Sequence, residues 1–117
     1  MITVRIFLKL SPDTRIGVGK VQLLEAIDAV GSISAAARSL KMSFRRAWEL
    51  LDHMNKAFGS PVVAGHVGSA GGTELTELGR LIVDRFRRIE AETEAIAAPH
   101  LAELDALRLT AGSPKAS

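Results

Sequence analysis

The sequence predicts a mainly α-helical fold with small β elements, and three observations carry this prediction. A period-two run of apolar residues opens the chain, three helical segments follow it, and a glycine-rich stretch precedes a long helical pattern. The chain has 117 residues, of which 47% are hydrophobic and 4% are aromatic. A single domain with an aliphatic, alanine-rich core is therefore expected.

Apolar residues alternate with other residues along the start of the chain, at Ile2, Val4, Ile6, Leu8 and Leu10. This period of two is typical of a half-buried β-strand. Ser11-Pro12-Asp13 is expected to end the strand, and an extended stretch around residues 15–18 is expected to return as a hairpin arm.

From Gly19 the apolar period changes to that of a helix, which Gly31 is placed to end with a left-handed cap. Ser32 and Ser34 offer hydroxyl caps for a second, short helix over residues 35–40. The sequence therefore predicts two consecutive helices separated by a very short connection.

After a connection at Lys41-Met42, Ser43 is placed to cap a third helix that runs to about Phe58. Five positions of this helix are predicted to face the core: Phe44, Ala47, Trp48, Leu51 and Met54. Four are predicted to face outward: Arg45, Glu49, Asp52 and Lys56.

The glycines of residues 68–72 predict the tip of a β-hairpin, with short strands at residues 61–64 and 73–75. Thr76 can cap a fourth and longest helix, which Pro99 is expected to interrupt before a short helical piece over residues 101–109. The expected domain spans residues 1–109, followed by a disordered tail over residues 110–117. An apolar seam on the long helix predicts dimerisation through Ile82, Phe86, Ile89 and Ile96.

Strand, helix, helix, tight turn, helix, hairpin and long helix is the order of a winged helix-turn-helix, whose helix after the turn enters the major groove of DNA. The net charge is only +2, so the local distribution of charge has to identify a partner. Arg38, Lys41, Arg45 and Arg46 lie close together with no acid before Glu49. This cluster, at the start of the predicted recognition helix, indicates double-stranded DNA.

The residue types at this end of the helix suit DNA chemistry. An arginine can bridge guanine O6 and N7 with two hydrogen bonds, which is the role expected of Arg45 and Arg46. Ser34 and Ser43, at predicted helix N-termini, can place hydroxyl and backbone N–H groups against phosphates. The other two cations of the cluster would neutralise backbone charge.

Several positions keep two interpretations. Phe44 either packs or contacts a thymine methyl group, while the apolar stripe favours a core position over base stacking for Trp48. His66, Ser69 and Thr73 of the hairpin are candidate contacts to the sugar-phosphate backbone, and His66 fits a plain surface residue equally well. The basic cluster as a whole could also be an ordinary solvated face.

The sequence lacks the residues that other functional classes would require. The chain has no cysteine, its three histidines lack the spacing of a metal-ligand pair, and no metal or cofactor is expected. No serine stands in a nucleophile elbow, and the glycine-rich hairpin lacks the Lys-Ser or Lys-Thr of a phosphate loop, so an enzyme is not expected. No apolar run reaches the roughly 18 residues of a membrane span, which predicts a soluble, cytoplasmic protein.

The segment GSISAAARSLKMSFRRAWELLDHMN, from Gly31 to Asn55, resembles the N-terminal DNA-binding domain of ModE-type molybdate-responsive regulators, itself similar to the LysR-type helix-turn-helix. The resemblance extends back through GKVQLLEAID and forward through GSAGG and LTELG. It implies a winged helix-turn-helix that dimerises partly through its long helix. Ser43, Phe44, Arg45, Arg46 and Trp48 match the Ser-aromatic-basic-x-Ala-Trp recognition segment of the family.

Regulators of this type also carry oxyanion-binding domains after the long helix. The 117 residues do not include them, so molybdate sensing is not expected of this chain. The hairpin also lacks lysine and arginine and is expected to hold DNA less strongly than a basic wing would.

The expected function is that of a sequence-specific transcriptional regulator, a homodimer that reads an inverted repeat. The alternative is a protein-interaction or assembly module on the same scaffold without DNA binding. An unknown small-molecule effector or a partner protein is compatible with both.

Overall fold

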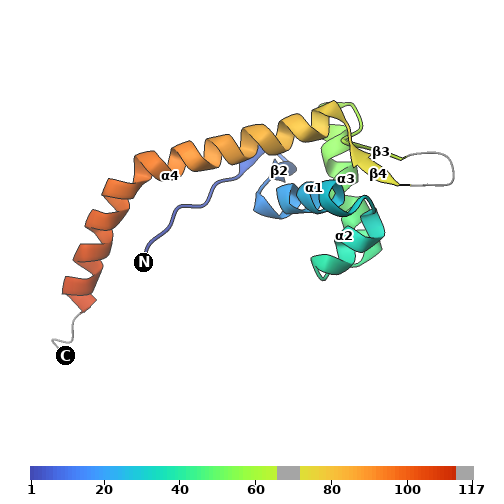
Figure 1. Ribbon diagram of the computed structural model, residues 1–117. Coiled ribbons are helices and arrows are strands. Elements are labelled where there is room, and N and C mark those ends of the chain that lie inside the picture. Colours follow the sequence, from blue (N-terminus) through green and yellow to red (C-terminus); the bar gives the residue numbers. More distant parts are fainter. Residues whose placement is uncertain (66–71, 113–117) are drawn as a thin grey trace. The chain divides into compact units, whose positions relative to one another are not determined.

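The computed structural model describes residues 1–65 and 72–112. The chain divides into two compact units, one formed by Phe7–Phe86 and the other by Met1–Ile6 together with Arg87–Ser117. The first unit contains three helices, two antiparallel hairpins and the start of the long last helix (Figure 1). The second unit contains the extended first residues and the remainder of that helix.

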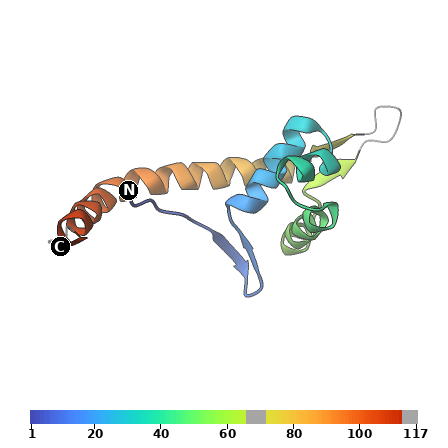
Figure 2. The same cartoon turned by 90° about the horizontal axis from the view of Figure 1, so that it is seen from below.

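Strands β1 (Leu8–Ser11) and β2 (Thr14–Ile16) form the first antiparallel hairpin, which Figure 2 shows from below. The sequence predicted a strand from Ile2 onward, but β1 begins only at Leu8, which pairs with Ile16. The short β2 offers no partner to earlier residues, which explains the difference. The alternation persists as burial, because Ile2, Val4 and Ile6 are half-buried between exposed neighbours.

Helix α1 spans Val18–Val30 and ends at Gly31, whose φ of 73° allows its N–H to reach the carbonyl of Ile27 at 2.7 Å. Helix α2 spans Ile33–Ser39, and the Ser32 hydroxyl accepts a hydrogen bond of 3.1 Å from the N–H of Ala35. The predicted glycine cap is confirmed. The prediction that α2 starts at residue 35 is wrong, since Ser32 alone caps the helix.

Helix α3 spans Phe44–Phe58, as the sequence predicted. The Ser43 hydroxyl accepts a hydrogen bond of 3.0 Å from the N–H of Arg46, and Gly59 ends the helix with a φ of 70°. Asn55 ties this helix to the following chain, because its Oδ1 accepts a hydrogen bond of 2.8 Å from the N–H of Val62. The last turns of α3 and the approach to the second hairpin are thereby fixed to each other.

The core of the first unit is aliphatic. Its fully buried larger side chains include Leu23, Leu24, Ile27, Leu51, Met54 and Phe86. Ala36, Ala37 and Ala47 fill the space between helices, which allows α2 and α3 to pack closely. The alanine-rich core predicted from composition is the one observed.

Strands β3 (Val63–Gly65) and β4 (Thr73–Leu75) form the second hairpin, with Val63 paired to Leu75. The N–H of Thr73 donates to the carbonyl of Gly31 at 2.9 Å, and the N–H of Thr76 donates to the carbonyl of Val62 at 3.0 Å. The base of this hairpin is therefore bonded both to the end of α1 and to the segment after α3.

Helix α4 spans Glu77–Gly112, and the Thr76 hydroxyl accepts a hydrogen bond of 3.1 Å from the N–H of Gly79, as expected of a cap. The predicted interruption at Pro99 is wrong, because the helix continues through it. Proline removes only one backbone donor, and the flanking turns keep theirs. The helix also continues past residue 109, the expected end of the domain, to Gly112, and residues 113–117 of the expected tail lie outside the described residues.

This architecture confirms the predicted fold class: mainly α with small β, a winged helix-turn-helix with a long C-terminal helix.

Candidate nucleic-acid interface

Helices α2 and α3 and the turn between them form the helix-turn-helix. Lys41 lies in this turn with a φ of 58°, the one non-glycine residue with positive φ in the described chain. Its N–H donates to the carbonyl of Arg38 at 3.0 Å, and that of Met42 donates to Ala37 at 2.9 Å. These bonds close the turn, and both predicted backbone-neutralising cations, Arg38 and Lys41, are exposed.

Arg45 and Arg46 occupy the first turn of α3 and reach into solvent, with side chains that are 90% and 56% exposed. Both approach Glu49: Arg45 Nε lies 3.6 Å from Oε2, and Arg46 Nη1 lies 3.4 Å from Oε1. Exposed ion pairs at this spacing contribute only about 0.3–0.5 kcal/mol. A phosphate or a base edge can therefore displace Glu49 at little cost.

The serines differ from each other. Ser43 stands at the N-cap of α3, where its oxygen already accepts the Arg46 N–H and its hydroxyl proton stays available for an outside acceptor. Ser34 is exposed inside the first turn of α2, next to the cap formed by Ser32. Only Ser43 has the cap position that the sequence assigned to both.

Phe44 and Trp48 form an edge-to-face pair on α3, with ring centroids 6.2 Å apart and planes at 73°. They are 52% and 41% exposed, so the core-facing positions predicted for Phe44 and Trp48 on this helix are wrong. The buried stripe runs through Ala47, Leu51 and Met54, and Trp48 lies beyond its edge. The pair lines a shallow hollow together with Arg45 and Asp52.

The candidate contacts of the second hairpin are only partly described. Thr73 is half-buried in β4, and its N–H is engaged by Gly31. His66 and Ser69 lie outside the described residues.

The sequence reasoning missed two cations beside α3. Lys20, in the first turn of α1, donates from Nζ to the carbonyl of Arg15 at 2.7 Å, and both residues line a cleft with Arg46 and His53. Nothing in the local sequence pattern marks these residues, because the fold alone brings β2 and the start of α1 against α3.

The four predicted dimerisation residues separate into two pairs. Ile82 and Phe86 are buried in the core of the Phe7–Phe86 unit. Ile89 is 40% exposed and Ile96 is 75% exposed, and both lie in the other unit. Only the second pair has surface to offer to another molecule.

Among the described residues, no group of three or more His, Asp or Glu side chains is arranged to hold a metal ion. No helix in that part of the chain combines the length and the apolar character needed to cross a bilayer.

Curated proteins similar to this chain carry the names that the sequence resemblance led us to expect. The chain is 37% identical over 101 residues to the molybdenum transport protein ModE of Azotobacter vinelandii, covering 81% of this chain and 37% of that protein. It is 40% identical over 79 residues to the molybdenum-pterin-binding protein MopB of Rhodobacter capsulatus, covering 66% and 29%. It is 34% identical over 77 residues to the transcriptional regulator ModE of Haemophilus influenzae, covering 64% and 30%.

The chain thus spans about a third of the length of these relatives, and the similarity falls in their N-terminal region. No family model matches the chain.

Among solved structures, the fold is similar to CbnR in complex with its target DNA, with a TM-score of 0.53 and 20% identity over 77% of this chain and 28% of that one. It is also similar to ArgP from Mycobacterium tuberculosis, with a TM-score of 0.51 and 20% identity over 83% and 32%. At this identity the likeness supports the fold.

Proposed function

We propose that this relative of the N-terminal region of ModE-type regulators is a sequence-specific DNA-binding transcriptional regulator, with α3 as its recognition helix. The observation that carries the proposal is the pair of exposed guanidinium groups of Arg45 and Arg46 on the first turn of α3, directly after the turn of a helix-turn-helix. The relative named as a transcriptional regulator, ModE of Haemophilus influenzae, and the DNA complex of CbnR support it.

In this proposal Arg45 and Arg46 read guanine in the major groove, while Lys41, Arg38 and the Ser43 hydroxyl hold the backbone. Ser34 and Thr73 contribute further backbone contacts, as His66 and Ser69 do from the wing. Phe44 takes the thymine-methyl role, since its ring is exposed on the outward side of the helix. The role requires no catalytic step, and the protein acts in the cytoplasm.

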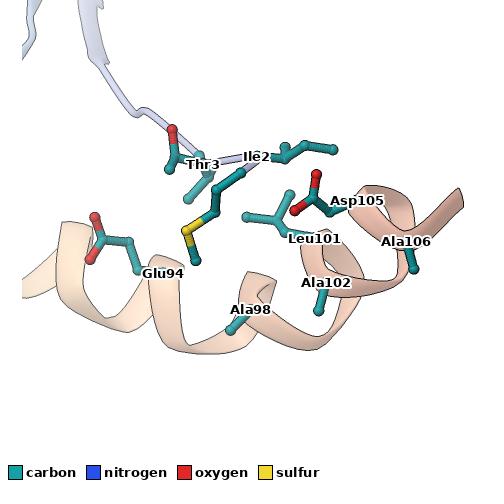
Figure 3. A pocket seen from close by; sticks show the side chains of 10 residues that line it. Ile2, Thr3, Glu94, Ala98, Leu101, Ala102, Asp105 and Ala106 are labelled. Carbon is teal, nitrogen blue, oxygen red and sulfur yellow. The ribbon is translucent and has the colours of Figure 1, made fainter. Parts of the chain in front are cut away.

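We propose a homodimer formed through the α4 stripe, defined as Ile89, Ile96, Leu104 and Leu107, all exposed. These residues follow one side of α4, as expected of a helix that packs on another helix. On the opposite side of α4, Figure 3 shows a hollow between residues 1–4 and the helix, whose labelled lining includes Ala98, Leu101 and Ala102; its volume is about 550 Å³ and its lining is mainly apolar.

Charge favours a second copy as the molecule that covers this stripe. Arg88 precedes the stripe's centre at Ile96 by eight residues and Glu103 follows it by seven, and both lie beside the stripe at helical spacing. An antiparallel pair of helices centred on Ile96 therefore sets Arg88 of one copy near Glu103 of the other. Such a dimer would present two recognition helices to an inverted repeat.

The test is selection of bound fragments from a pool of duplexes, followed by titration of the selected site. Arg45→Ala and Arg46→Ala should each weaken binding by about 1–3 kcal/mol and relax the preference at one base pair. Lys41→Ala should weaken all sequences alike, and Arg85→Ala, which removes an exposed arginine elsewhere, should leave binding unchanged. Binding that ignores the first three changes would contradict the proposal.

A protein-interaction module is the second candidate, and the exposed Phe44–Trp48 pair is the observation that favours it. The same selection separates the two functions. A wild-type protein that selects no duplex at low salt, yet retains a folded helix-turn-helix, would support the interaction module.

A further inference from the structure

The cleft beside α3 gathers positive charge from three parts of the fold. Arg15 comes from β2, Lys20 from the first turn of α1, and Arg46 from the first turn of α3, and together they line an open hollow of about 380 Å³. We call these three residues the flanking basic cluster. β2 contacts both α1 and α3, so the cluster depends on the tertiary fold.

The Arg15 guanidinium is held in place from one side. Its Cζ lies 4.6 Å from the centroid of the Phe7 ring, and the Arg15 carbonyl accepts the Lys20 ammonium at 2.7 Å. An arginine stacked on a ring loses less freedom on binding a ligand than a free one does. The cluster is therefore partly organised before any ligand arrives.

The cluster carries a surplus of positive charge. Lys9 pairs directly with Arg15 across the β1–β2 hairpin, an arrangement of like charges that destabilises a hairpin. Partial burial, together with the Arg46 and Arg15 guanidinium groups, lowers the pKa of Lys20. Asp13 is the one carboxylate lining the cleft, and Glu49 approaches Arg46 from the outer face of α3. An anion bound here would relieve this repulsion.

Arg46 belongs both to this cleft and to the exposed first turn of α3, where it stands beside Arg45. An anion in the cleft would thus continue the surface assigned to DNA. We propose that Arg15 and Lys20 of the flanking basic cluster bind a backbone phosphate of the DNA strand that borders the major groove occupied by α3, beside the base that Arg46 contacts. This inference rests on the proposed function and extends its footprint to the β1–β2 hairpin.

The test compares Arg15→Gln and Lys20→Gln with Arg85→Gln, which removes an exposed arginine on α4. Each cleft variant should weaken binding to every duplex alike and lower the slope of log K against log salt by about one. Lys20→Arg should keep the wild-type slope, because it keeps the charge. Circular dichroism checks that all variants remain helical, and Lys9→Gln, at an exposed strand position, should show a smaller loss in the same direction.

Phosphate-ethylation interference locates the contact. The wild-type protein and Arg85→Gln should show interference at phosphates beside the α3 site that Arg15→Gln and Lys20→Gln no longer show. Identical interference patterns and equal salt slopes in all variants, with selective wild-type binding intact, would overturn the inference and leave the proposed function standing. A changed base preference in the cleft variants would also overturn it, since backbone contacts carry none.

Two further outcomes are decisive. Amide shifts around Lys20 on titration with inorganic phosphate, without any salt-slope difference between variants, would assign the cleft to a free oxyanion and overturn the DNA assignment. A wild-type protein that binds no duplex would overturn both this inference and the proposed function.

Discussion

The two units of the chain differ in how far they bury their apolar side chains. In the part of the chain that the structure describes, every fully buried side chain lies in Phe7–Phe86, and the other unit has none. That other unit leaves Ile96, Leu104 and Leu107 more than half exposed. The first unit buries an apolar core, whereas the second leaves apolar side chains exposed along α4.

Substitutions at two residues one turn apart on α4 test this difference in burial most directly. Phe86→Ala should lower the free energy of unfolding by about 3–5 kcal/mol, because it empties a fully buried site. Ile89→Ala should cost under about 1 kcal/mol at protein concentrations where the chain is monomeric. Urea denaturation measures both. Equal losses would show that the second unit is packed in the same way as the first.

The second prediction concerns the proposed dimer formed through the α4 stripe. Ile96→Glu should weaken the dimer by about 100-fold or more, since the symmetric interface would desolvate two carboxylates and lose two apolar contacts. Ala91→Glu places the same charge on the opposite side of α4 and serves as the control. Sedimentation equilibrium gives the dissociation constants. If both variants dimerise like the wild type, the α4 stripe is not the interface.

Substitution of two glycines tests how closely the backbone of the first unit is packed. A Cβ at Gly79 would lie 2.2 Å from the carbonyl oxygen of Val62, so Gly79→Ala should lower the free energy of unfolding by about 2–3 kcal/mol. Gly19→Ala in α1 meets nothing within 4 Å and should raise it by about 0.5–1 kcal/mol. The unfolding temperatures of the two variants should therefore shift in opposite directions from that of the wild type. A stabilised Gly79→Ala would mean that α4 does not approach Val62 so closely.

The smallest effect separates the two serines of the helix-turn-helix. Ser43→Ala removes the cap of α3 and should cost about 1 kcal/mol of stability. Ser34→Ala, at an exposed position inside α2, should leave stability unchanged or slightly raised. Calorimetry at one pH and salt concentration compares them, and equal losses would contradict the cap assignment.

The sequence predicted most of the elements whose signals are local. Gly31 and Gly59 end helices in the left-handed conformation, Ser43 and Thr76 cap them, and each acts through its own neighbours. The expected strand from Ile2 was wrong over its first residues because a strand needs a partner, and β2 supplies partners only from Leu8 onward.

The candidate site was predictable to a similar extent. The exposure of Arg45 and Arg46 follows from the helical period. That of Trp48 does not, because an apolar residue at the edge of a stripe fits either side. The flanking basic cluster could not be predicted, because Arg15, Lys20 and Arg46 come from three elements that only the folded chain brings together.

The hydrogen bonds that fix α3 have a consequence for how such a protein can change. Ser43 and Asn55 anchor its two ends, and Ala47, Leu51 and Met54 anchor its inner side. Arg45, Trp48 and Asp52 take no part in this scaffold. The outward residues can therefore be substituted one at a time while the helix stays folded. A new target preference can evolve or be engineered on this helix without loss of stability.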